Sequence, residues 1–167
     1  MNEYLDMNKI VKLQELKPLA RANMLALMVF KERVDLAGNI YIRHLNKVAD
    51  SFSEDDYKIV ALLHDLVEDT SFTFEDLEYL GFSKIIIDAL KLLTNDLDNY
   101  DSYIERLVSS DNEMAKKVKI VDLLDNMNIT RFKKLETKDI ARVKNKYLKA
   151  YSILINDIER RIENDWY

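Results

Sequence analysis

The sequence predicts an all-α protein that folds as one domain over residues 1–167, with its core between about residues 18 and 161. Three observations support this fold class. The 167 residues are 48% hydrophobic and 33% charged, which is typical of an ordinary globular domain. Only two glycines and one proline are present, so the chain lacks the turn residues that many short strands require. Apolar residues instead recur at helical spacing.

The first expected helix runs from about Pro18 to Arg33. Proline suits the first turn of a helix, and the apolar residues Ala22, Leu25 and Val29 follow at spacings of three and four. This spacing predicts one buried helical face.

A short helix carrying His44 is expected soon after Tyr41, beyond a glycine-containing break at residues 35–39. Ser53 and Thr73 each precede an aspartate by three positions, which is a start signal for a helix. The remaining helices are expected from Ser53 to about Asp69, from Thr73 to Leu80 before Gly81, from Lys84 to Thr94, from Tyr100 to Ser109, from Asn112 to about Arg131 and from Lys138 to Arg161.

The charge balance and hydropathy exclude two classes of partner. The chain has 25 basic and 30 acidic residues, a formal charge of −5, and no clustered basic tract of the kind that binds nucleic acid. The longest apolar stretch, Met24–Phe30, is far shorter than the roughly 20 residues of a membrane span. Glu3 and Asp6 replace the basic start of a signal peptide. We therefore expect a cytoplasmic protein with neither nucleic-acid nor membrane partners.

Charged residues occur where a core helix is expected. His64, Asp65, Glu68 and Asp69 interrupt an apolar segment, and helical spacing places all four on one broad side. Asp122 lies in a second apolar segment, where an unpaired carboxylate is costly to bury.

A divalent cation would offset several of these costs together. The chain has no cysteine and only two histidines, so a metal site depends on imidazole and carboxylate groups. His44, His64, Asp65 and Asp122 would supply two nitrogens and two oxygens and leave positions open for water and a substrate oxygen. The alternative is that the His-Asp pair is a surface pair or a helix-end interaction.

The motifs resemble those of the HD-domain metal-dependent phosphohydrolases. The similarity is carried by Ile40–His44 with Val48-Ala49, by Leu62–Thr70, by Leu93-Thr94 and by Val118–Met127. Within that superfamily the chain looks most like the hydrolase domains of RelA/SpoT-type alarmone enzymes and their small single-domain relatives. The resemblance extends from about Ala22 to Leu154 and implies the compact helical HD-domain fold.

The resemblance also implies roles for these residues. It implies that His44, His64, Asp65 and Asp122 bind a metal ion, which is usually Mn²⁺, with Fe, Zn, Co or Mg as alternatives. It assigns Glu68 and Asp69 to positioning or activating the attacking water, and it places Asn126 beside the nucleotide. Glu68 and Asp69 could instead be helix-end charges, and Asn126 could bond within its own helix.

The chain departs from the pattern before the first histidine. The alarmone hydrolases that it resembles have an Arg-x-x-Gly pattern there, with basic side chains for the phosphates of the substrate, and some small relatives have Asp-Lys-x-Gly. This chain has Asp35-Leu36-Ala37-Gly38 and lacks the expected basic residue. Arg33, Arg43 or Lys119 could contact a phosphate instead, or be solvated charges.

Three further features of the sequence indicate the function less directly. Asp125 occupies a position where the long alarmone enzymes commonly carry histidine, which resembles the small relatives. Tyr147 and Tyr151 lie one turn apart and could stack on a base, or form part of the core. Lys116 and its neighbouring lysines are expected to be solvated.

The expected function is hydrolysis of a phosphoester or pyrophosphate bond in a small nucleotide, with ppGpp as the leading substrate and 3′-pyrophosphate release as the leading reaction. The alternatives are an HD nucleotidase or phosphodiesterase with another substrate, and a non-catalytic nucleotide or metal sensor. Glu68 and Asp69 favour the enzyme, because binding alone needs no proton-transfer group. The expected partner is the nucleotide, and the sequence predicts no particular oligomeric state.

Overall fold

The computed structural model describes residues 4–164, and their regular structure is helical apart from one isolated antiparallel bridge between Val34 and Ile40. The all-α fold class is therefore confirmed. No helix within this part of the chain combines the length and the apolar character of a membrane span. The helices are α1 (Met7–Gln14), α2 (Pro18–Phe30), α3 (Ile42–Ala49), α4 (Asp55–Leu63), α5 (Leu66–Asp69), α6 (Phe74–Tyr79), α7 (Lys84–Leu93), α8 (Tyr100–Ser109), α9 (Glu113–Asn126), α10 (Thr137–Arg142) and α11 (Leu148–Asn164), with a 3₁₀ turn at Ile129–Arg131 and a π-turn at Val143–Tyr147.

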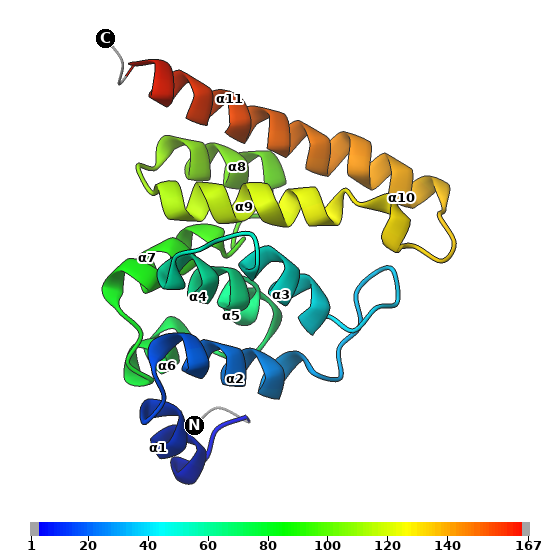
Figure 1. Cartoon of the computed structure of the whole chain (residues 1–167). Coiled ribbons are helices and arrows are strands. Elements are labelled where there is room, and N and C mark those ends of the chain that lie inside the picture. The colour runs from blue at the N-terminus through cyan, green and yellow to red at the C-terminus, as the bar shows by residue number, and fades with distance from the viewer. Residues whose placement is uncertain (1–3, 165–167) are drawn as a thin grey trace.

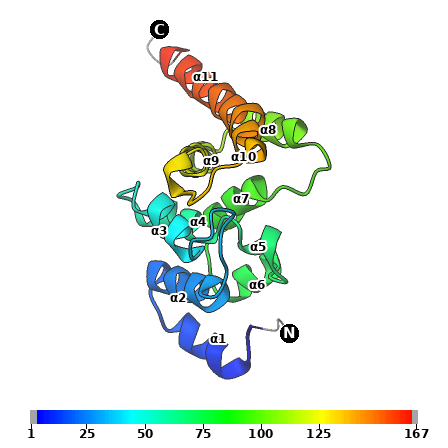
Figure 2. The same cartoon turned by 90° about the vertical axis from the view of Figure 1, so that its right-hand side faces the viewer.

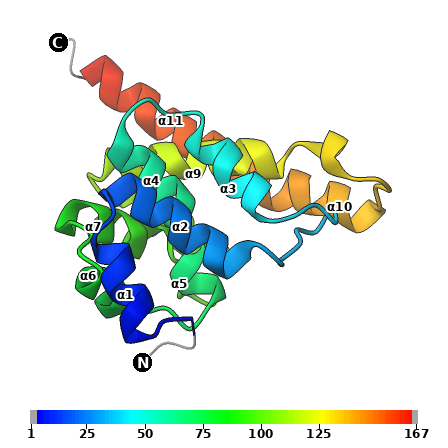
Figure 3. The same ribbon diagram turned by 60° about the horizontal axis from the view of Figure 1, so that its bottom comes forward.

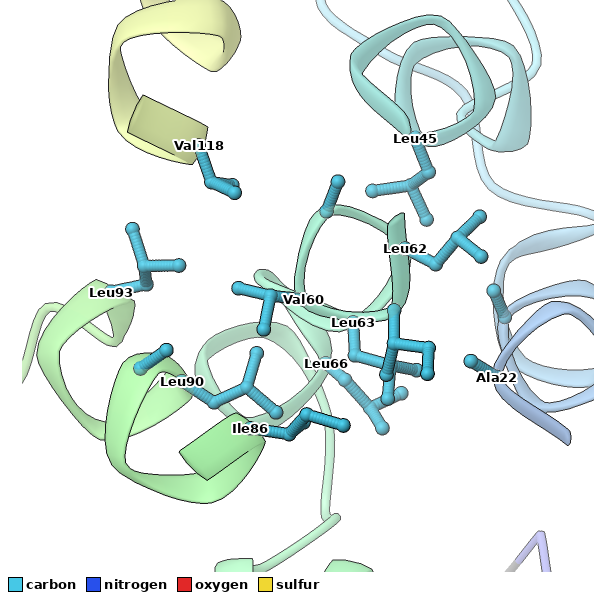
Figure 4. Packing of buried hydrophobic residues seen from close by; sticks show 14 of the residues in the cluster. Ala22, Leu45, Val60, Leu62, Leu63, Leu66, Ile86, Leu90, Leu93 and Val118 are labelled. Carbon is cyan, nitrogen blue, oxygen red and sulfur yellow. The ribbon is translucent and has the colours of Figure 1, made fainter. Parts of the chain in front are cut away.

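Helix α4 is the centre of the fold. Its last five residues, from Ile59 to Leu63, are all buried, so this end of the helix is covered on every side. It packs against α2, α3, α7 and α9. Figure 4 shows its side chains surrounded by apolar residues of those neighbours, among them Ala22, Leu45, Leu90 and Val118. The C-terminal end of α4 is therefore fixed inside the core.

The other helices form layers around this centre. In Figure 1, α8, α9 and α11 lie at one end of the molecule and α1 and α6 at the other, and Figure 2 shows the same order from the side. α11 packs on α8 and α9 through buried side chains that include Ala150 and Leu154. The loop between α2 and α3 extends away from the core toward α10 (Figure 3).

The helix expected over residues 53–69 is interrupted. His64 and Asp65 separate α4 from α5, because the backbone of Asp65 has φ −97° and ψ 0°, outside the helical region. The expected start signal is also not used. The hydroxyl of Ser53 bonds the carboxylate of Glu54, and Glu54 itself is the residue that precedes the helix.

The C-terminal helices differ from the expectation in their bounds. α9 ends at Asn126 instead of near Arg131, and the side chain of Asn128 then accepts a hydrogen bond from the Thr130 amide to begin the 3₁₀ turn. The helix expected over residues 138–161 is present as α10 and α11, joined by the π-turn. In contrast, the signal at Thr73 is confirmed as a full capping box.

Buried contacts also extend N-terminal to the expected core of about residues 18–161. Ile10 and Leu13 of α1, for which the sequence predicts no helix, belong to the core cluster. Arg21 holds this helix in place because its buried guanidinium donates to the carbonyls of Leu13 at 2.9 Å and Leu80 at 2.6 Å. Arg21 thus joins the end of α1 to the end of α6.

Lys116 is buried, although it is expected to be solvated. Its Nζ donates to Oδ2 of Asp157 at 2.6 Å and to the carbonyl of Val108 at 2.7 Å. The lysine therefore joins α9 to α11 by a buried ion pair.

Candidate active site

The four predicted metal ligands meet at the C-terminal end of α4. α3 supplies His44, the turn after α4 supplies His64 and Asp65, and α9 supplies Asp122. One donor atom from each of His44, His64 and Asp65 lies within 4.8 Å of the others. Oδ1 of Asp122 lies 3.2 Å from Nε2 of His44 and 3.6 Å from Nε2 of His64. Asp65 is partly exposed, and the other three side chains are buried.

The two imidazoles direct their Nε2 atoms at carboxylate oxygens. Nδ1 of His64 lies 2.7 Å from the carbonyl of Ala61, and since a carbonyl can only accept, Nδ1 carries the proton. Among the described residues, Nε2 of His64 is buried without a hydrogen-bond partner, although Oδ2 of Asp65 is 3.0 Å away. A divalent cation could take the place of a proton on this buried nitrogen beside carboxylate oxygens, so this donor set fits such an ion.

The site attracts positive charge. Burial alone would lower the pKa of His64, but the carboxylates of Asp65 and Asp122 outweigh it and raise that pKa well above its ordinary value. Burial would also lower the pKa of His44, but its hydrogen bonds to the carboxylates of Asp122 and Asp125 raise it. Burial would raise the pKa of Asp122, but Lys119 and the two imidazoles hold it well below its usual range. Carboxylates therefore remain charged next to the imidazoles, as a cation site requires.

Two further side chains hold ligands in place. Nδ1 of His44 donates to Oδ2 of Asp125 at 2.7 Å, and the hydroxyl of Tyr41 donates to Oδ2 of Asp65. Burial would raise the pKa of Asp125, but hydrogen bonds from His44 and Lys47 and the charge of Arg131 lower it to about 2. A carboxylate on the outer nitrogen fixes the tautomer and orientation of a ligating histidine. Asp125 thus supports the site, a role that its position in the sequence does not indicate.

Lys119 and Asn126, predicted to bind substrate, both contact Asp122. Lys119 donates to Oδ2 at 2.9 Å and Asn126 donates to Oδ1 at 2.5 Å. Asp122 lies between them on α9, three residues after Lys119 and four before Asn126, so helical spacing explains both contacts. Both side chains also line the pocket beside the metal ligands. They orient Asp122 and can also face a bound molecule.

Glu68 and Asp69 lie on α5 beside the ligands and line the same pocket. Oε2 of Glu68 accepts a hydrogen bond from the amide of Asn95 at 2.8 Å. Burial raises the pKa of Glu68, and burial and the nearby Asp65 raise the pKa of Asp69. Arg33 binds Asp69 through its carboxylate at 3.2 Å and through its carbonyl. Glu68 is therefore the better placed of the two to exchange a proton.

The ligands open into a pocket of about 460 Å³. This volume lies within the range of roughly 300–1,000 Å³ that is usual for small-molecule sites. Lys119, Arg131, Arg142 and Lys146 bring cationic side chains to its lining, and Tyr100, Tyr103 and Tyr147 bring aromatic rings. The pocket therefore combines carboxylates near the imidazoles with cations and rings along its other walls.

Asp35 stabilises its own loop and forms an ion pair with Arg131. Its Oδ1 accepts hydrogen bonds from the amides of Ala37 and Asn39, and its Oδ2 accepts one from Arg131 at 2.6 Å. Arg131 thus lines the pocket next to the position where the family pattern has a basic residue. The sequence does not indicate that Arg131 brings a positive charge to this position.

The other predicted phosphate contacts lie outside this pocket. Arg43 is exposed and lines a second pocket of about 270 Å³ on the other side of His44. Arg33 is bound to Asp69, as described above. Of the two tyrosines considered for base stacking, Tyr147 lines the main pocket and Tyr151 does not.

The fold is similar to that of several solved structures, among them a metazoan ortholog of SpoT that hydrolyzes ppGpp and plays a role in starvation responses. The two proteins share 20% sequence identity and a TM-score of 0.62, over 87% of this chain and 96% of that chain. No protein-family model matches the sequence, and neither does any curated protein. The chain therefore has a fold of the kind found in a ppGpp hydrolase, in agreement with the HD-domain fold that the motifs predict.

Proposed function

We propose that the protein is a metal-dependent phosphohydrolase that cleaves a phosphoester or pyrophosphate bond in a small nucleotide. The observation that carries this proposal is the buried Nε2 of His64, which lacks a hydrogen-bond partner and faces the carboxylate of Asp65 beside a pocket with cationic walls. The fold shared with a ppGpp hydrolase supports ppGpp as the leading substrate and a diphosphate as the leaving group.

His44, His64, Asp65 and Asp122 would hold the cation, with Mn²⁺ as the first choice. When bound, a divalent cation polarises a phosphoryl oxygen and lowers the pKa of water. Asp125 and Tyr41 hold two of the ligands in orientation through the hydrogen bonds given above.

The remaining steps belong to side chains of the pocket. Glu68 has a raised pKa and lies one turn beyond the ligands, so it can hold or release a proton during attack by water. Lys119 and Arg131 place positive charge along the walls, where phosphate oxygens are stabilised by charge-assisted hydrogen bonds. Asn126 orients Asp122 and offers its amide to the pocket.

The test is metal analysis of the purified protein, followed by incubation of the Mn²⁺-loaded form with ppGpp and with nucleoside mono-, di- and triphosphates. Release of pyrophosphate to leave GDP supports the ppGpp assignment. Cleavage of another nucleotide but not of ppGpp rejects that substrate and keeps the phosphohydrolase. Stoichiometric metal with no cleavage of any nucleotide refutes the enzyme and favours a sensor.

A further inference from the structure

The π-turn at Val143–Tyr147 brings adjacent residues of the last helical segment to the pocket. It joins α10 to α11 without a break, and the amide of Leu148 closes it by donating to the carbonyl of Val143. A π-turn contains one residue more than an α-turn and often occurs at functional sites. Lys146 and Tyr147, at its end, both line the pocket.

Lys146 differs from the other cations of the pocket wall, because each of those forms an ion pair with a carboxylate. Lys119 pairs with Asp122 at 2.9 Å, Arg131 with Asp35 at 2.6 Å and Arg142 with Asp139 at 3.2 Å. Within residues 4–164, Lys146 has neither an ion pair nor a hydrogen bond. Its Nζ lies over the ring of Tyr100, 4.2 Å from the centroid, and 5.9 Å from that of Tyr147.

The surroundings of Lys146 disfavour an isolated positive charge. Burial lowers the pKa of its ammonium, and repulsion from Lys119 and Arg142 lowers it further, while Glu68 and Asp122 compensate only in part. An anion that enters the pocket would reverse this imbalance, because it would pair with Lys146 and reduce the repulsion among the three cations. A phosphate suits an ammonium, which binds it as a point charge.

We propose that Lys146, presented by the π-turn, binds a phosphate group of the substrate and so contributes to the preference for phosphorylated ligands. Its ammonium lies over the ring of Tyr100, and this cation–π contact holds it at the pocket wall. This assignment rests on the proposed function for the identity of the substrate. It does not depend on that function for the binding of an anion.

The test compares Lys146→Met with Lys144→Met and Lys146→Arg. Methionine retains much of the apolar stem and removes the charge. Lys144 belongs to the same π-turn and is exposed, as Lys146 is, but it does not line the pocket, so its variant controls for the loss of one lysine. In Mn²⁺-loaded protein with ppGpp, Lys146→Met should raise KM about tenfold or more with little change in kcat. The two other variants should stay near the wild type.

GDP binding provides a readout that does not require hydrolysis. In calorimetric titrations of the purified full chain, Lys146→Met should bind GDP about tenfold more weakly than Lys144→Met. Equal GDP affinity of these two variants, no GDP binding by the wild type, or loss of bound Mn²⁺ from Lys146→Met would overturn the assignment. A wild type that binds GDP but cleaves no nucleotide refutes the proposed function, and the titration then decides the role of Lys146.

Discussion

Replacement of Asp125 tests whether the buried imidazoles are metal ligands. This carboxylate lies outside the predicted donor set and contacts it only through Nδ1 of His44, at 2.7 Å. Both side chains are buried, so solvent does not screen their interaction. If His44 binds a cation through Nε2, the charge on Asp125 increases the basicity of the ring and fixes its orientation.

Asp125→Asn and Asp125→Leu should weaken Mn²⁺ binding to different degrees. Loss of a carboxylate that supports a ligating histidine costs about 10- to 100-fold in metal affinity, or about 1.4–2.7 kcal/mol. An asparagine oxygen can still accept a hydrogen bond from His44 Nδ1, so Asp125→Asn should reduce the Mn²⁺ affinity by about 10-fold. Leucine leaves the ring N–H without a partner, so Asp125→Leu should reduce the Mn²⁺ affinity by about 100-fold.

The assay is calorimetric titration of metal-free protein with Mn²⁺, and Lys47→Met is the matched control. Lys47 contacts Oδ1 of Asp125 at 2.5 Å, but its side chain is 58% exposed and lies outside the predicted donor set. Its loss should change the affinity by no more than about threefold, since exposed ion pairs contribute little. Mn²⁺ affinities of both Asp125 variants within about twofold of the wild type would refute the assignment of His44 as a ligand.

The remaining predictions concern the ligands, the proton carrier and the buried ion pair. His64→Ala or Asp122→Ala should abolish stoichiometric Mn²⁺ and turnover together, as elemental analysis and a phosphate-release assay would show; an active variant that keeps its metal contradicts the ligand set. Glu68→Gln should retain Mn²⁺ but reduce kcat by about 10²- to 10⁴-fold, and unchanged kinetics would leave Glu68 with a structural role only. Asp157→Asn leaves the buried ammonium of Lys116 without its counter-charge and should cost about 3–5 kcal/mol in urea unfolding at pH 7. Burial would raise the pKa of Asp157, but Lys116 and Arg161 hold it below 3.8. This stabilisation should therefore be lost as the pH falls below that value, and a pH-independent difference would contradict the pairing.

The sequence predicts a helix end best where the residues that cap it are close together in the sequence. The capping box of α6 is such a case, because Thr73 and Asp76 bond each other's backbone within four residues. The break between α4 and α5 has no such signal. Asp65 leaves the helical region where its carboxylate accepts from Tyr41, which is 24 positions away in the sequence.

The same distinction applies to buried charges. Helical spacing explains why Lys119 reaches Asp122, because the two lie within one turn. Lys116, three positions earlier, has the same residue type and lies on the same helix, but its partner Asp157 is 41 positions away. A sequence pattern alone thus gives no reason to expect that Lys116 is buried.

The charge of the pocket shows why family resemblance at a single position is a poor guide to substrate binding. Asp35 and Leu36 stand where the resemblance leads one to expect a basic residue, which suggests a pocket with one cation fewer. The carboxylate of Asp35 instead binds Arg131, 96 positions away, and Arg131 lines the pocket. Lys146 adds a further positive charge from the π-turn. The cations thus come from the C-terminal half of the chain, and the loss of one basic residue from the first motif does not argue against a phosphorylated substrate.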